Sequence, residues 1–151
     1  MDNVPILGAD GLVAVRMPVA ATVSYMLFYY YLLIGLQRKV KYAVQAELRA
    51  QGKEFDRYHS SDPRMLAADR IVGNTLEQMC PFLCSMWLYA ACVSCVMAGY
   101  LGFLYLGFRI LYPYLIGTRL SHMQSKRVYF ATLPAYAIIF YFLVTSLLAV
   151  F

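Results

Sequence analysis

The amino-acid sequence predicts an all-α membrane protein, built as a bundle of four transmembrane helices. Apolar residues make up 62% of the 151 residues and charged residues only 14%, whereas about a quarter of a soluble domain is charged. The mean hydropathy is +0.58. The apolar residues stand in long uncharged runs, and most basic residues gather between these runs. Because a helix crosses the bilayer core with roughly 20 apolar residues, each long run is a candidate span.

The lengths of the uncharged runs predict the individual helices. Met17–Leu36 supplies 20 uncharged residues and Val128–Phe151 supplies 24. The middle tract, 65–117, has 30 uncharged residues between Gln78 and Arg109, too many for one span, so we expect two helices joined by a tight turn. We therefore predict a single domain, 1–151, with a loop at 37–64 and spans near 14–36, 65–90, 94–117 and 128–150.

The distribution of Lys and Arg predicts the orientation in the membrane. Seven of these residues lie in the loop 37–64 and three in the segment 118–127, whereas the chain before the first uncharged run has only Arg16. Two spans separate the basic segments, so both lie on the same side, which is the cytosolic side by the positive-inside rule. Both termini then lie opposite. We expect an integral protein of the endoplasmic reticulum or another organelle membrane.

The net charge of +5 is concentrated in the same two segments. Such juxtamembrane basic residues set topology and attract anionic lipid headgroups. We therefore expect membrane lipids as partners and no nucleic acid.

The second predicted span contains charged residues where an apolar segment should begin. On a helix with about 100° between successive residues, Arg70, Asn74 and Glu77 fall on one stripe, together with Pro81 and Cys84. A charge at the centre of a membrane helix costs roughly 2.5–3.5 kcal/mol, so such residues are candidates for a functional site. The alternative is an ion pair, either Arg70 with Glu77 or Asp69 with an Arg, that only joins helices.

A second polar group is predicted to lie beside this stripe. Arg109 and Tyr112 stand near the end of the third predicted span, and antiparallel packing brings that end next to the start of the second. The combined pocket would be cationic, with one carboxylate and one amide. It would suit an anionic ligand that also has an amine, because Arg binds carboxylates with two parallel hydrogen bonds, and an apolar co-substrate could enter from the lipid.

The motif Arg70-x-x-x-Asn74-x-x-Glu77, followed by Pro81 and preceded by a basic first loop, resembles the membrane-associated proteins in eicosanoid and glutathione metabolism, the MAPEG family. The likeness extends over most of the chain, since four spans in about 150 residues are typical of this family. The resemblance implies a homotrimer that binds glutathione between protomers. It implies glutathione contacts for residues on three helices: Arg38, Arg70, Asn74, Glu77, Arg109 and Tyr112. Lys39, next to Arg38, is an additional candidate.

The resemblance leaves the catalytic group open. In the family's enzymes an Arg at the start of the fourth helix stabilises the glutathione thiolate. Counting from Arg109 leads to Ser125, and the nearest basic residues are Lys126 and Arg127. Many catalytic members also have a Tyr where this chain has Ile116.

Two functions are therefore considered. The first is a glutathione-dependent membrane transferase or peroxidase that acts on lipophilic electrophiles or lipid hydroperoxides. The alternative is a non-catalytic member of the family, either a lipid-binding scaffold or an accessory subunit of a larger membrane complex.

The four cysteines all fall in or beside apolar spans. Cys92 and Cys95 have the spacing of a redox pair or of half a zinc site, but both histidines lie in predicted loops. We interpret the cysteines as packing residues and expect no metal site.

Overall fold

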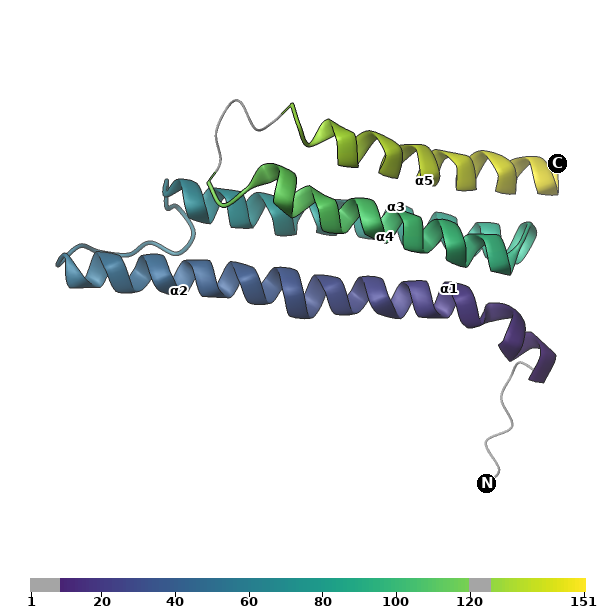
Figure 1. The fold of residues 1–151 in the computed structure, drawn as a ribbon, viewed down its shortest axis with the longest axis horizontal. Helices are drawn as coiled ribbons and strands as arrows, with labels where there is room; N and C mark the ends of the chain where they lie inside the picture. The colour runs from purple at the N-terminus through teal and green to yellow at the C-terminus, as the bar shows by residue number, and fades with distance from the viewer. Residues whose placement is uncertain (1–8, 120–125) are drawn as a thin grey trace, which may run out of the picture.

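The computed structural model describes residues 9–119 and 126–151, which form four helical rods (Figure 1). The described chain is helical apart from short connections, which confirms the all-α prediction. The first rod is continuous and has three parts: α1 (Ala9–Leu27), the π-helix η1 (Phe28–Leu33) and α2 (Ile34–Ala50). The other three rods are α3 (Pro63–Cys92), α4 (Cys95–Ile116) and α5 (Tyr129–Val150).

The first rod differs from the sequence prediction. We expected a loop over 37–64, but the helix continues to Ala50, and only residues 51–62 connect it to α3. The reason is that one side of α2 packs against α3: Val44 is buried, and Lys41, one turn before it on the same face, forms an ion pair with Asp69 of α3 at 3.0 Å. Gln37 also donates a hydrogen bond to Asp69, at 2.7 Å.

Local chemistry fixes where α3 and α4 begin and end. The Asp62 side chain accepts a hydrogen bond from the backbone N–H of Arg64, and Pro63 occupies the first helical position, where its missing N–H has no cost. Ser94 caps α4 in the same way, so the turn between α3 and α4 has only two residues. At the far end of α4, Gly117 has a φ of 76°, which favours glycine.

The rods lie nearly side by side, with α3 and α4 between the first rod and α5 (Figure 1). α5 packs on both α3 and α4, while α1 packs on α4 and α2 on α3. One end of the bundle, which we call the basic end, holds the far end of α2 and the starts of α3 and α5 (Figure 1). The chain ends at the opposite end of the bundle.

Three of the rods are long and apolar enough to cross a membrane: Asp10–Ala50, Cys95–Ile116 and Tyr129–Val150. α3 is not among them, and it is the rod with Asp69, Arg70 and Glu77. With 30 residues it is long enough, and it packs against the other rods. We therefore treat α3 as a fourth spanning helix, and its charged residues require an explanation of their own.

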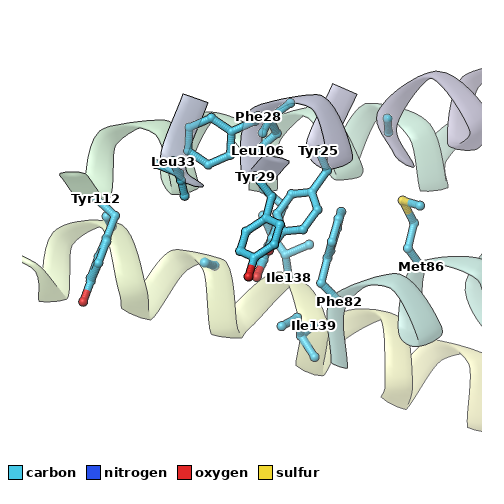
Figure 2. Packing of buried hydrophobic residues seen from close by; sticks show 14 of the residues in the cluster. Tyr25, Phe28, Tyr29, Leu33, Phe82, Met86, Leu106, Tyr112, Ile138 and Ile139 are labelled. Carbon is cyan, nitrogen blue, oxygen red and sulfur yellow. The ribbon is translucent and has the colours of Figure 1, made fainter. Parts of the chain in front are cut away.

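Aromatic side chains from three helices meet in the core of the bundle (Figure 2). The rings of Phe82 and Tyr105 are stacked, with centroids 3.8 Å apart and planes 6° apart. Tyr25 of α1 packs against the Phe82 ring at 5.1 Å. All three side chains are fully buried, and together they join α1, α3 and α4 in the core.

Candidate functional site

Arg109 of α4 is the most unusual residue of the core, because its side chain is charged but only 1% exposed. One guanidinium nitrogen, Nη2, donates hydrogen bonds to Asn74 Oδ1 at 3.0 Å and to Thr75 Oγ1 at 2.8 Å. Both acceptors belong to α3. The antiparallel packing expected from the sequence thus brings Arg109 and Asn74 into contact.

The buried charge of Arg109 is only partly compensated. Within residues 9–119 and 126–151, no carboxylate forms an ion pair with it, and its Nε and Nη1 have no hydrogen-bond partner. Its guanidinium carbon lies 4.9 Å from the centre of the Tyr112 ring, which gives a cation–π contact. Because unpaired buried donors are costly, a charge in this position suggests a functional reason.

A layer of hydroxyl groups continues from Arg109 towards the aromatic core. The Tyr25 hydroxyl donates a hydrogen bond to the backbone carbonyl oxygen of Thr75 at 3.0 Å, and the Thr75 hydroxyl donates to the carbonyl oxygen of Ile71. The Tyr105 hydroxyl is also buried, and within the described residues it has no hydrogen-bond partner. Tyr25 therefore supports the segment of α3 that presents Asn74, a role that the sequence analysis did not identify.

The stripe on α3 lies largely on the outside of the chain. Arg70 and Glu77 are exposed, whereas Asn74 between them is buried at 7% exposure. The Arg70 side chain interacts electrostatically with Tyr112. No ion pair joins Arg70 and Glu77 among the described residues. The alternative explanation, an ion pair that only joins helices, therefore applies to Asp69, which pairs with Lys41 of α2, but not to Arg70 and Glu77.

Two further polar residues belong to the same region and were missed from the sequence. Gln78 of α3 donates a hydrogen bond to the Tyr136 hydroxyl of α5 at 3.2 Å. Tyr136 also interacts electrostatically with Tyr112. Only the packing of α5 on α3 brings these residues together, and the apolar surroundings of Tyr136 in the sequence gave no sign of it.

Arg38 and Lys39 are exposed on α2. Neither forms a hydrogen bond or ion pair with the α3 stripe within the described residues. Arg38 lines a shallow groove of about 520 Å³ on the outer side of the first rod, together with Tyr30 and Tyr31.

The candidate catalytic residues Lys126 and Arg127 are exposed in the turn before α5. Their side chains form no hydrogen bond or ion pair with the described part of the chain. Ser125, to which the count from Arg109 leads, lies outside the described residues. Ile116, which stands where many catalytic members of the family have a Tyr, is buried in the core.

The basic end has its own ion-pair network, which closes the connection between α2 and α3. Arg64 donates hydrogen bonds to both carboxylate oxygens of Glu47, at 2.8 and 2.7 Å, and also to Asp62. Hydrogen bonds from Arg64 hold the pKa of the Asp62 carboxyl below its usual value. This network orients the start of α3, six residues before Arg70.

The cysteines do not behave as buried packing residues within one chain. Cys80, Cys84 and Cys92 are exposed and Cys95 is half-buried, all as free thiols. Cys80 and Cys84 place their sulfur atoms 3.8 Å apart. In the part of the chain that the structure describes, no three His, Cys, Asp or Glu side chains come together as metal ligands.

Comparison with known proteins gives one positive result. The model of the MAPEG family matches residues 15–148, nearly the whole chain. No curated protein and no solved structure matches this chain. The matched segment contains α3 and α4, most of the first rod and of α5, and every candidate site residue described above.

Proposed function

Because this chain belongs to the MAPEG family, we propose that it is a glutathione-dependent membrane transferase or peroxidase acting on lipophilic electrophiles or lipid hydroperoxides. The observation that carries the proposal is the α3 stripe. It presents Arg70 and Glu77 on the outside of the chain, with Asn74 between them held by the buried Arg109.

The chemistry of the stripe fits glutathione, which has two carboxylates, one ammonium group and two peptide groups. Arg70 can bind a carboxylate through its planar fork of donors, and Glu77 can bind the ammonium group. The Asn74 carbonyl oxygen is taken by Arg109, so its NH₂ group remains to donate to a peptide carbonyl or carboxylate.

The structure suggests indirect roles for the two α4 residues of the predicted site. Arg109 is too deeply buried to touch a ligand outside the chain, and we assign it the role of orienting Asn74. Tyr112, also buried, interacts electrostatically with Arg70, and we assign it the role of positioning that guanidinium.

We propose that the site is completed in a homotrimer. Arg70 and Glu77 face outward, and Arg38 lies on the outer side of a different rod of the same chain. Packing one copy's α2 against another copy's α3 would bring these groups together. A second copy would also cover the stripe's charges, which are costly to expose to lipid.

Activation of glutathione needs a fixed positive charge beside its sulfur. A nearby cation lowers a thiol pKa from about 8.5 towards neutrality and so supplies the thiolate nucleophile. We propose Arg127, or Lys126, for this role. Both stand at the basic end, which we place on the cytosolic side of the endoplasmic reticulum or another organelle membrane.

Two observations favour a second candidate, a non-catalytic lipid-binding scaffold or accessory subunit. Ile116 offers no hydroxyl where many enzymes of the family have one, and Lys126 and Arg127 make no contact with the α3 stripe in one chain. Such a protein could keep the stripe as an interface while lacking thiolate chemistry.

Calorimetric titration of glutathione into the detergent-purified protein tests the site. We expect Arg70→Ala and Glu77→Ala each to weaken binding by about tenfold or more, since each removes a charge-assisted contact. Arg16→Ala is the control, because Arg16 is also exposed but belongs to α1, which lies towards the opposite end of the bundle. Unchanged affinity in both site variants would refute the assignment.

A further inference from the structure

A second, separate concavity lies between the first rod and α4. This groove, which we call the α2–α4 groove, has a volume of about 840 Å³. Ala67, Ala68 and Ile71 of α3 form its floor, η1 and α2 form one wall, and the end of α4 forms the other. On α3 this floor is turned by about 110° from the stripe of Arg70 and Glu77, so it is not part of the proposed glutathione site.

The groove exists because the first rod changes its packing partner. Along α1 it lies so close to α4 that a Cβ on Gly99 would clash with Met17. Along α2 it packs on α3 instead, so the space towards α4 is left open. Small residues keep the space free: a Cβ added to Gly35, which lines the groove, would meet nothing within 4 Å.

The length of the groove matches one leaflet of a bilayer. Its lining on the first rod runs from Phe28 to Val40, which is roughly 18 Å along a helix. This is a little more than half of the bilayer's hydrocarbon thickness of about 30 Å. Most of the lining is apolar, so the groove fits an acyl chain of the leaflet at the basic end.

The mouth of the groove is cationic. Lys39 and Arg64 both line it at the basic end. Arg64 is already engaged by Glu47 and Asp62, but Lys39 forms no hydrogen bond or ion pair with any described residue. Thr118 adds a hydroxyl group at the same level. A free ammonium group above an apolar groove is complementary to a phosphate above an acyl chain.

We propose that the α2–α4 groove binds an anionic phospholipid, with one acyl chain between η1 and α4 and the phosphate group at Lys39. The cationic mouth of the groove selects a lipid with a negative headgroup. The apolar part of the groove, about one leaflet long, accepts the acyl chain. On α3 the groove uses a different face from the stripe of the proposed glutathione site.

Native mass spectrometry of the detergent-purified protein tests this proposal. The protein is titrated with phosphatidic acid and with phosphatidylcholine of identical acyl chains. We expect a lipid adduct that favours phosphatidic acid, and we expect Lys39→Gln to reduce that preference by about fivefold, the equivalent of roughly 1 kcal/mol for one basic residue near a lipid headgroup.

A second pair of variants tests the groove itself. Gly35→Leu should fill it and weaken the binding of both lipids. Gly107→Leu is the matched control, because Gly107 is also a helical glycine with open space around it but does not line the groove. The proposal is overturned if both lipids bind equally to the original protein, if Gly35→Leu leaves binding unchanged, or if free fatty acid or a second copy of the chain occupies the groove instead.

Discussion

At the scale of single residues, the buried Arg109 explains why a membrane helix contains polar side chains. Its guanidinium needs acceptors in the core, and α3 supplies Asn74 and Thr75. Two of its nitrogen atoms still lack partners. Asn74 thus satisfies the buried charge through its carbonyl oxygen, and in the proposed site its NH₂ group would also bind glutathione.

One substitution of Asn74 should therefore change the stability of the protein and its affinity for glutathione in opposite directions. Asn74→Asp places a carboxylate against an uncompensated guanidinium, so we expect a higher melting temperature. Glutathione affinity should fall at the same time, because a carboxylate cannot donate a hydrogen bond and repels the ligand's carboxylates. Asn74→Ala is the reference and should lower both quantities, with a stability loss of about 1.5–3 kcal/mol for a hydrogen bond to a charged group. Thermal melts and calorimetry measure the two effects, and a parallel change of both in Asn74→Asp would contradict this explanation.

A second residue-level prediction concerns Asp62 and acid pH. The folded-state pKa of this carboxyl is lowered by its hydrogen bonds from Arg64. A lowered pKa means that the carboxylate contributes stability above its unfolded pKa of about 4, and that this contribution is lost as the pH falls through the folded value. Asp62→Asn should therefore reduce stability at pH 7, and it should flatten the decline of stability below about pH 4. Melting temperatures recorded against pH test this, with Glu54→Gln as the control, because Glu54 is exposed in the same connection and forms no ion pair with the described residues.

At the scale of elements, the helix contacts depend on a few small residues. α1 and α4 approach closely where a Cβ on Gly99 would lie only 2.7 Å from the backbone carbonyl carbon of Met17. Gly102, one turn further along, faces Ala21 and Met86. This contact fixes α4 against the first rod and so sets the depth of Arg109.

Adding one methyl group at this contact should separate the two helices. We expect Gly99→Ala to destabilise the protein by about 1–3 kcal/mol, the usual cost of overfilling a packed core. Gly107→Ala changes the same residue type on the same helix where nothing lies within 4 Å, and it should have no such cost. Equal melting temperatures for the two variants would show that the α1–α4 contact is not tight.

The elements were largely predictable from the sequence, and the errors have physical causes. The uncharged runs predicted the first residues of α4 and α5 to within one residue, because such apolar segments have few alternatives to a spanning helix. We predicted a loop at 37–50 because this segment is rich in basic residues. It forms an amphipathic helix instead, and Asp69 of α3 provides a partner for its Gln37 and Lys41.

The site was less predictable than the elements. Helical spacing placed Arg70, Asn74 and Glu77 on one stripe, but it did not show that Asn74 faces inward while its neighbours face outward. That difference depends on where α4 lies. Tyr25 and Tyr136 carry no local signal at all, since their polar contacts arise only from the packing of distant helices.

At the scale of the whole molecule, the exposed stripe on α3 makes a single chain look incomplete. Three of its residues, Arg70, Glu77 and Cys84, are exposed on a helix that lies between the other rods in Figure 1. A trimer would cover them and bring in Arg38.

The trimer itself is directly measurable. Light scattering in detergent, corrected for bound detergent, should give three times the chain mass of 17.2 kDa. Leu76→Lys, next to the stripe on the exposed side of α3, should shift the protein towards smaller species, whereas Leu148→Lys at the far end of α5 should not. A monomeric mass for the original protein would contradict the shared site and favour the scaffold or subunit alternative.

The most direct measurement is the ultraviolet difference spectrum of glutathione bound to the purified protein at neutral pH. The account predicts a thiolate band, since a positive charge beside the sulfur lowers its pKa, and predicts that Arg127→Ala or Lys126→Ala abolishes the band while binding persists. Bound glutathione without a thiolate band in the original protein would contradict the enzymatic function, and absence of binding in the folded protein would contradict the site.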